Sequence, residues 1–222
     1  GSRGLGGREL LRDIGCEIAP GEVLGIIGPN GAGKTSLLEV VSGRIRPKSG
    51  RVIYRDRDIT STRLHQRARL GIGRTYQTPV VPEELTVGEA FKAARQAFRP
   101  YLTRFDAEYG AELVHFHAPN EMRCASLETI NRRKLLLACL LMRRPSVMLL
   151  DEPAAGLINS EIDEIDHLIR RLSKEMQIGI VIVEHRIELL DKIVDRVMVV
   201  DAGDMIASGS LAEILDNPRV HA

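Results

Sequence analysis

A glycine-rich turn between an apolar run and a helical pattern constrains this chain more than any other feature. The turn reads GPNGAGKT and fits the pattern G-x-x-x-x-G-K-[S/T]. It directly follows EVLGIIG, which has the composition of a buried strand, and it opens KTSLLEVVSG, which has an apolar helical face. Glycines let the backbone curl so that successive N–H groups face an anion, and the helix adds its positive end. This order of elements predicts an α/β fold with a phosphate site.

The turn supplies the candidate nucleotide-binding residues, which are Gly28, Pro29, Asn30, Gly31, Ala32, Gly33, Lys34, Thr35 and Ser36. We expect Lys34 to reach the β- and γ-phosphates of a nucleoside triphosphate and the hydroxyl of Thr35 to ligate Mg²⁺. The alternative is a glycine turn that binds nothing. That alternative fits poorly, because the strand before the turn and the helix after it both match the pattern.

Acidic and polar residues end three further predicted strands. In VMLLDEP, Asp151 is expected to hold Mg²⁺ through water, and Glu152 to accept a proton from an attacking water. Gln77 ends GIGRTYQ and His185 ends IVIVEH, and open α/β sheets bind ligands at this end of their strands. Gln77 is therefore a candidate contact to metal and water, and His185 a candidate clamp on the γ-phosphate. Either residue alone would more often be structural.

Apolar strands alternate with helical patterns along much of the chain, which is typical of an α/β fold. SVMLLD and IGIVIVE read as strands of a parallel sheet covered on both faces, with the helix SEIDEIDHLIRRLSKE between them. DRVMVVDAG and DMIASG predict a terminal hairpin, and GRVIYRD predicts a strand. The helix TRLHQRARLG is expected to place Arg63, Arg67 and Arg69 on a solvated face. We expect a mostly parallel central sheet flanked by helices, with a small amino-terminal antiparallel part.

The segment Pro79–Ala125 differs, because aromatic residues concentrate there and strand patterns disappear. It predicts an inserted helical lobe, whose core we expect to contain Phe91, Phe98 and Phe105. The predicted organisation is one domain, 1–222, with a core formed by 1–78 and 143–222 and a helical subdomain formed by 79–142.

Charge and hydropathy exclude several classes of protein. The chain has 31 Lys and Arg against 30 Asp and Glu, so it lacks the basic excess of a nucleic-acid-binding surface. Its longest apolar run, Leu135–Met142, is too short to span a bilayer, and the amino terminus lacks the apolar core of a secretory signal. The three cysteines have no metal-ligand spacing and are expected to be buried in a reducing cytosol.

The motifs GPNGAGKT, GRTYQ, LLDEP and VIVEH occur in the order and spacing of ABC-type ATPase subunits. The chain resembles this family from about Leu5 to Val220. The phrases ARLGIGRTYQ, LTVGEAF, DEPAAG and IASGSLAEILDNPRV are similar to the ATPases of branched-chain amino acid importers.

The resemblance implies a P-loop NTPase fold of ABC type, with ATP and Mg²⁺ as cofactors. It also implies ATP hydrolysis that powers a membrane permease, with import of branched-chain amino acids or a related small polar solute. The implied partners are permease subunits and a second ABC ATPase subunit, identical or different, on the inner face of the cell membrane, with no nucleic acid. The alternative is a regulatory or degenerate ABC module with low intrinsic ATPase activity, as part of a longer polypeptide.

The chain departs from the family at the signature position, where the family has Leu-Ser-Gly-Gly-Gln at a helix start facing ATP on the opposite subunit. That position here holds Leu127, Glu128, Thr129, Ile130 and Asn131. Glu128 places an anion where a hydroxyl donor is expected, and Thr129 and Ile130 add bulk where glycine allows close approach. We expect this signature to bind the ATP of a partner subunit weakly. Ser126 is expected to cap the helix.

Two smaller departures concern adenine and the subunit contact. The family has an aromatic residue that stacks on adenine where this chain has Leu5, so adenine binding is expected to be weaker. In the loop after Glu152, the family often has Asp or Asn where this chain has Ile158, with Asn159 one position later.

Overall fold

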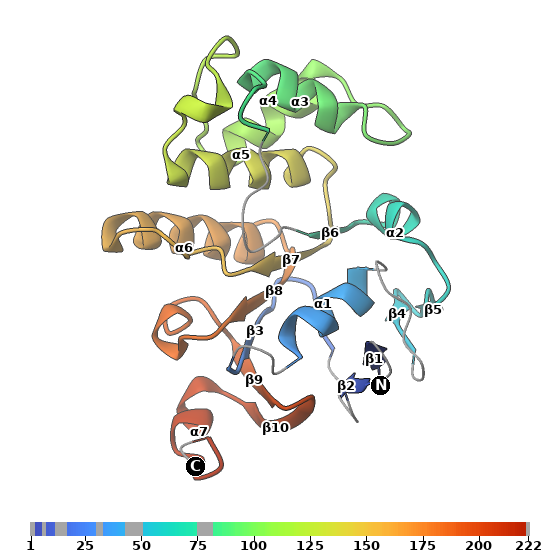
Figure 1. The fold of residues 1–222 in the computed structure, drawn as a ribbon, viewed down its shortest axis with the longest axis vertical. Helices are drawn as coiled ribbons and strands as arrows, with labels where there is room; N and C mark the ends of the chain where they lie inside the picture. The colour runs from blue at the N-terminus through green and yellow to red at the C-terminus, as the bar shows by residue number, and fades with distance from the viewer. Residues whose placement is uncertain are drawn as a thin grey trace.

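A six-stranded sheet covered by helices on both faces forms the centre of the molecule (Figure 1). This computed structural model describes residues 3–5, 8–11, 17–29, 33–42, 51–74 and 82–220, and it describes only the backbone of 3–5, 8–11, 35, 36 and 65. The strands are β3 (Val23–Ile27), β6 (Ile72–Arg74), β7 (Val147–Asp151), β8 (Gly179–Glu184), β9 (Arg196–Asp201) and β10 (Asp204–Gly209).

The strand order is β10-β9-β3-β8-β7-β6, and all neighbours are parallel except the β9–β10 hairpin. The predicted parallel sheet and terminal hairpin are therefore confirmed. This order places β3 between β8 and β9, so the carboxyl end of β3 lies beside that of β8. Ligands bind at such an edge of open α/β sheets.

Two small antiparallel pairs accompany the sheet: β1 (Arg3–Leu5) with β2 (Arg8–Leu11), and β4 (Ile53–Tyr54) with β5 (Arg57–Asp58). The strand predicted in GRVIYRD is present but shorter than that run, because β4 ends at Tyr54. Arg55 and Asp56 have φ of 50° and 62°, and positive φ at both central residues makes a tight hairpin turn. The chain therefore turns back after Tyr54, and β5 pairs with β4.

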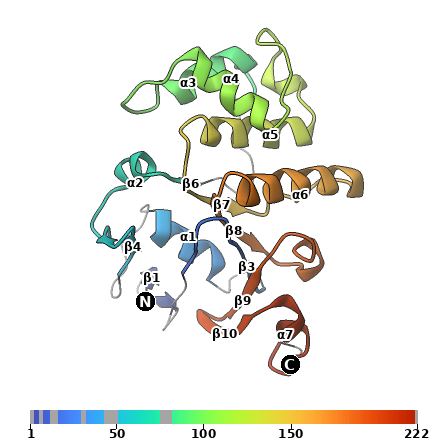
Figure 2. The same ribbon diagram turned by 180° about the vertical axis from the view of Figure 1, so that it is seen from behind.

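Helices pack on both faces of the sheet, and three more form a lobe beyond it (Figures 1 and 2). The longer helices are α1 (Lys34–Ser42), α2 (Leu64–Leu70), α3 (Val87–Arg95), α4 (Arg104–Leu113), α5 (Thr129–Leu141), α6 (Asn159–Lys174) and α7 (Leu211–Leu215). Two 3₁₀ turns, η1 (Cys124–Ser126) and η2 (Ile187–Leu189), lie between them. Helices α3–α5 fall inside the predicted subdomain 79–142, whose exact boundaries stay a prediction.

Alternate residues of the strands feed two separate hydrophobic cores, as the two-residue period of a strand requires. In β8, Ile180 and Ile182 join the core formed with α5 and α6, whereas Val181 and Val183 join the core formed with α1. Both faces of the central strands are thus buried, which explains why their sequences are nearly continuous apolar runs.

The lobe buries some of its aromatic residues and exposes others. Phe91 and Phe116 pack edge to face with ring centroids 5.9 Å apart, and the Arg143 guanidinium lies 3.7 Å from the ring centroid of Phe98. Phe105, however, is 79% exposed, so its predicted place in the lobe core was wrong. It follows the N-cap residue Thr103 closely and lies on the outer side of the first turn of α4.

A glycine in the middle of β3 admits the segment that follows β8. A Cβ on Gly25 would stand 2.7 Å from Cδ1 of Leu190 and 2.9 Å from Cγ1 of Val194. No real side chain tolerates such distances, so Gly25 allows η2 and the residues after it to pack directly on the central strand.

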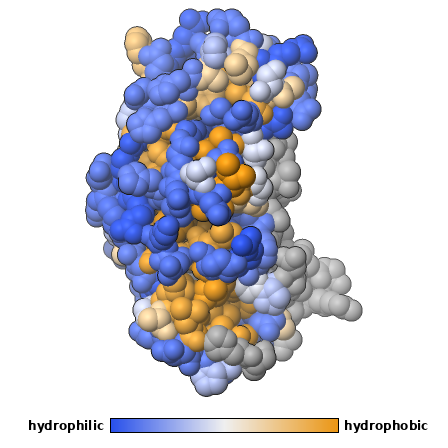
Figure 3. Space-filling view, turned by 90° about the vertical axis from the view of Figure 1, so that its left-hand side faces the viewer, coloured by the Kyte–Doolittle hydropathy of each residue, from blue (hydrophilic) through white to orange (hydrophobic). Residues whose placement is uncertain are grey.

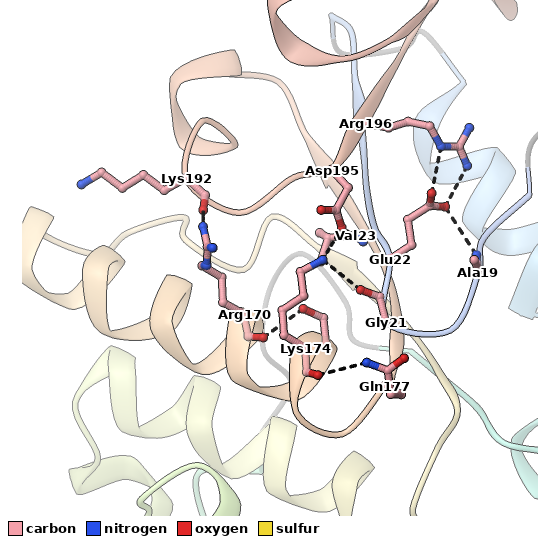
Figure 4. A network of polar contacts seen from close by, with 11 residues as sticks. Ala19, Gly21, Glu22, Val23, Arg170, Lys174, Gln177, Lys192, Asp195 and Arg196 are labelled. Carbon is pink, nitrogen blue, oxygen red and sulfur yellow. Dashed lines mark hydrogen bonds and ion pairs between the residues drawn. The ribbon is translucent and has the colours of Figure 1, made fainter.

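A polar network fixes the start of β3 to the end of α6 (Figure 4). Asp195 accepts the backbone N–H of Val23 at 2.8 Å and the ammonium of Lys174 at 2.6 Å. Lys174 also donates to the carbonyl of Gly21 at 3.0 Å, and Arg196 pairs with Glu22 at 3.0 Å. The strand that leads into the phosphate loop is therefore anchored where it enters the sheet.

The surface is mixed in character. The side that carries α6 and α7 is largely hydrophilic, with hydrophobic areas that are most extended towards the end of the molecule that carries α7 (Figure 3). Apolar atoms normally contribute a large part of the surface of a folded domain. No helix in the described part of the chain has the length and apolar character needed to cross a bilayer.

Arg67 does not lie on a solvated face as predicted, because it is 1% exposed. All five N–H donors of its guanidinium reach backbone carbonyls: Val40, Val41, Ile59, Thr60 and Thr62, at 2.8 to 3.0 Å. The carbonyls of Val40 and Val41 belong to the last turn of α1, which has no helical partners for them. Arg67 therefore holds the far end of the helix that begins at Lys34.

We expect Arg67→Met to lower the free energy of unfolding in urea by about 3 kcal/mol or more, because buried carbonyls lose a charged donor. Arg69→Met on the exposed side of the same helix is the matched control and should change stability by less than about 0.5 kcal/mol. Equal losses in the two variants would show that the carbonyl contacts of Arg67 do not hold α1.

Candidate functional site

The predicted phosphate-binding residues lie at the junction of β3 and α1. Gly28 and Pro29 follow β3 directly, and α1 begins at Lys34. Gly33 has φ of 105°, a backbone conformation that residues with a side chain rarely adopt, so the turn into the helix needs glycine there. Asn30, Gly31 and Ala32 lie outside the described residues, as do the side chains of Thr35 and Ser36.

Lys34 is buried at the edge of the sheet, with 6% of its surface exposed. Its ammonium donates to the carbonyl of Gly28 at 2.5 Å and to that of Glu184 at 3.3 Å. Burial lowers the pKa of Lys34, while the negative charges of Glu152, Glu184 and Asp151 act in the opposite direction. One buried cation thus joins the start of the phosphate loop to the end of β8.

Two neighbouring parallel strands deliver the acidic residues and the histidine to the same place. β7 ends at Asp151 with Glu152 next, and β8 ends at Glu184 with His185 next. Both Asp151 and Glu152 are 4% exposed, and Nδ1 of His185 lies 2.5 Å from Oε1 of Glu152. The structure therefore brings Lys34, Asp151, Glu152 and His185 together, although they are far apart in the sequence.

Glu184 belongs to the same cluster but was not predicted from the sequence. It is 1% exposed, and burial raises its pKa to about 7. Ligand atoms of Glu152, Glu184 and His185 all lie within 4.8 Å of one another. A signal was available, because a carboxylate that ends a continuous apolar strand beside a candidate histidine is unusual.

Of the predicted metal contacts, only Asp151 can be placed. Burial raises the pKa of Asp151, and the nearby guanidinium of Arg74 lowers it. Arg74 lies in β6 and also pairs with Glu39 of α1 at 2.9 Å. Gln77 lies outside the described residues, and nothing is described of the Thr35 side chain. The donor at this position is a hard carboxylate oxygen, which suits Mg²⁺.

The signature position lies at the junction between η1 and α5. Ser126 ends η1 and does not cap α5, so that prediction was wrong; the N-cap is Glu128, whose side chain makes no capping hydrogen bond. The reason is the extended backbone at Leu127 and Glu128, which separates the two helical segments. Glu128 and Thr129 are exposed at the helix start.

Ile130 does not add bulk at this surface as predicted. It is 7% exposed and packs in the core of its own chain. Leu127 is buried beside it at 6%, whereas Asn131 is half-buried. The exposed departures from the expected signature are therefore Glu128 and Thr129.

The remaining predicted positions lie at the ends of two other elements, β1 and α6. Leu5 ends β1, where only the backbone is described. Ile158 is the N-cap of α6 and is 66% exposed, and Asn159 is the first residue of that helix. Sequence reasoning also missed Arg133, whose guanidinium bonds the backbone of Glu152; nothing in the run NRRK distinguishes it from its neighbours.

Comparison with known proteins gives a consistent result. The family model described as ABC transporter matches residues 11–155. The chain is 34% identical to the lipopolysaccharide export system ATP-binding protein LptB of Acidithiobacillus ferridurans, over 96% of this chain and 89% of that protein. It is 32% identical to the high-affinity branched-chain amino acid transport ATP-binding protein LivG of Escherichia coli K12, over 97% and 91%.

Solved structures agree with the predicted fold. A nucleotide-free ATP-binding cassette from an ABC transporter superposes with a TM-score of 0.89 at 25% identity, covering 99% of this chain and 94% of that one. The ADP conformation of an ATP-binding cassette gives the same values. The predicted mostly parallel sheet with flanking helices and an antiparallel part is therefore confirmed.

The buried carboxyl of Glu184 should make stability depend on pH. Its pKa in the folded protein, about 7, exceeds the ordinary value of 4.5, so folding binds a proton between these values. Its contribution is fully present below about pH 4.5 and is lost as the pH rises through 7. We expect Glu184→Gln to flatten the fall in unfolding free energy between pH 5 and 8, by about 1–3 kcal/mol, in urea titrations without nucleotide. If the unfolding free energy of Glu184→Gln falls with pH as steeply as that of the native protein, the pKa of Glu184 is not raised in the folded state.

Proposed function

We propose that this chain, which belongs to the ABC transporter family of ATP-binding proteins, couples ATP hydrolysis to movement of a small solute through a membrane permease. Members of this family hydrolyse ATP, and the chain is an ATPase of this kind. The observation that carries the proposed site is the meeting of Lys34, Glu152 and His185 at one edge of the sheet.

Lys34 binds the phosphates in this proposal, together with the backbone of residues 28–36. Its present acceptors are two backbone carbonyls, which the more basic oxygens of a triphosphate replace. Because Lys34 is buried, little water competes for its charge, and the interaction with phosphate is correspondingly strong.

Glu152 acts as the general base that accepts a proton from the attacking water. Its carboxylate is held by Nδ1 of His185, which fixes the direction in which the free lone pairs point. With Nδ1 donating to Glu152, Nε2 of His185 is left to clamp the γ-phosphate, and it donates to a phosphate oxygen when the ring is the imidazolium, in which both nitrogens carry a proton. Gln77, proposed from the sequence alone, positions the water.

Asp151 fits a role at Mg²⁺, because it is a buried carboxylate at the end of the strand two places from the phosphate loop strand. Thr35 and Gln77 complete the proposed set of oxygen donors. When bound, Mg²⁺ neutralises negative charge on the phosphate oxygens. Burial raises the pKa of Asp151, and the positive charges of Arg74 and Lys34 act against that effect.

The proposed solute is a branched-chain amino acid or a related small polar molecule, imported by permease subunits on which the chain sits at the cytoplasmic face. LivG of Escherichia coli and BraF of Pseudomonas aeruginosa, at 32% and 30% identity, are named for branched-chain amino acid transport. LptB, at 34%, is named for lipopolysaccharide export, so solute and direction need experiment. Co-purification with permease subunits and solute uptake by the reconstituted complex provide the test.

A second candidate function is a regulatory ABC module that binds ATP and hydrolyses it slowly. The exposed Glu128 at the start of α5 favours it, because an anion there repels the phosphates of a partner's ATP. Two unit charges 4 Å apart repel by about 1 kcal/mol in water and by more in a closed interface. We therefore propose an asymmetric pair, in which a second ATPase subunit with an intact signature motif contacts the ATP bound to this chain.

Lys34→Ala should weaken Mg·ATP binding about 10- to 100-fold, because a charged hydrogen bond contributes about 1.5–3 kcal/mol. Glu152→Gln should bind Mg·ATP as the native protein does, but its rate of hydrolysis should fall by at least about 100-fold. Equilibrium binding of a fluorescent ATP analogue and single-turnover hydrolysis separate the two effects. Unchanged binding in Lys34→Ala would contradict the proposed phosphate site.

Replacing Glu128 by Ser and Thr129 by Gly should raise the steady-state ATPase rate of the chain alone about fivefold, since about 1 kcal/mol of repulsion is removed. Ile130 is kept in this variant, because its side chain fills the core. Glu108→Ser in α4, which also replaces an exposed acid on a helix of the lobe, is the control. A native rate in the double variant would mean that Glu128 does not limit turnover.

A further inference from the structure

We propose that Arg133 is a positioning residue for Glu152, which ties the segment around the catalytic carboxylate to helix α5. The inference rests on the proposed function, because it concerns the residue that we assign as the general base. Arg133 itself touches no reacting atom in this arrangement.

The contacts of Arg133 are with backbone, not with side chains. Its Nη1 donates to the carbonyl of Glu152 at 3.1 Å, and its Nη2 donates to the carbonyl of Ala155. The side chain is buried, with 9% of the residue exposed. It therefore fixes the course of the chain between Glu152 and Ala155, and leaves the Glu152 carboxylate to His185.

That course needs fixing, because Glu152 has φ of 47°. Residues with a side chain rarely adopt this left-handed conformation and keep it only where their surroundings impose it. The N–H of Glu152 donates to the carbonyl of Val183 at 2.9 Å, and its carbonyl accepts from Ala155 at 3.1 Å and from Arg133. Of these three bonds, the one from Arg133 is the one whose partner lies in a helix.

Helix α5 also passes near the same segment one turn earlier. The Cγ2 of Thr129 lies 3.9 Å from the place that a Cβ on Gly156 would occupy. Thr129 and Arg133 are four residues apart and so share a face of the helix. The first two turns of α5 thus lie near residues 152–156, and the hydrogen bonds of Arg133 link the helix to that segment.

The hydrogen bonds of Arg133 differ from those of Arg67, which has a purely structural role. Arg67 uses all five donors on carbonyls, whereas the buried Nε of Arg133 has no partner among the described residues. Burial lowers the pKa of Arg133, and the charges of Glu184 and Glu152 oppose that effect. A buried guanidinium with an unsatisfied donor is costly, which favours a role in the site over one in stability.

The test compares Arg133→Met and Arg133→Lys with Lys134→Met, which removes the adjacent buried cation of α5 that pairs with Glu164 of α6. We expect Arg133→Met to lower kcat about 10- to 100-fold, as small displacements of a catalytic group do. Its Kd for Mg·ATP should stay within about threefold of native, since Lys34 is untouched. Arg133→Lys should recover part of kcat, and Lys134→Met should keep it near native.

Hydrogen exchange of the amides of residues 152–156 gives a readout that does not depend on activity. We expect faster exchange there in Arg133→Met, with the rest of the sheet unchanged. Native kcat in Arg133→Met overturns the inference, and so does a loss of kcat that only follows a loss of folded protein or is matched by Lys134→Met. A native chain that does not hydrolyse ATP refutes the proposed function instead, and unchanged exchange in Arg133→Met then still overturns the positioning role.

Discussion

The buried ammonium of Lys34 is the charge on which the rest of the site depends. Three carboxylates, those of Asp151, Glu152 and Glu184, are almost fully buried within reach of its field. Burying carboxylates is unfavourable unless opposite charge or hydrogen bonds compensate. Lys34 supplies part of that compensation, beside Arg74 at Asp151 and His185 at Glu152, while it also holds the start of the phosphate loop. The arrangement requires β3, β7 and β8 to end at one edge, which a parallel sheet with this strand order achieves. The strand order of the sheet therefore determines which charges meet at the site.

Two buried arginines show how the chain separates stability from chemistry. Arg67 stands outside the site and satisfies every donor on carbonyls, two of them in the last turn of α1. It steadies the phosphate loop from the far end of its helix. Arg133 bonds the backbone of Glu152, and its Nε has no hydrogen-bond partner within the described part of the chain. Arginine thus holds a helix end at position 67 and positions a loop at position 133. Only the hydrogen-bond partners distinguish the two roles.

The sequence was sufficient for the parts of the molecule that depend on local pattern. The phosphate loop, the apolar strands of the parallel sheet and the hairpin β9–β10 all carry patterns set by residue type and spacing, and these were predicted. Features that depend on tertiary contacts were not. Nothing in TRLHQRARLG shows that Arg67 turns inwards while Arg63 and Arg69 stay outside, and nothing in LETIN shows that Ile130 enters the core. Ser126 was a reasonable cap by residue type, but the extended backbone at Leu127 moves the helix start two residues on.

The glycine at the centre of β3 limits how this domain can vary. Any side chain at Gly25 would force the side chains of Leu190 and Val194 to shift, and both residues belong to the stretch of chain that leads from His185 to β9. Random mutagenesis should therefore find fewer tolerated substitutions at Gly25 than in the surrounding loops. Glycine is a poor strand former, yet a design that aims to stabilise β3 must keep it at this position.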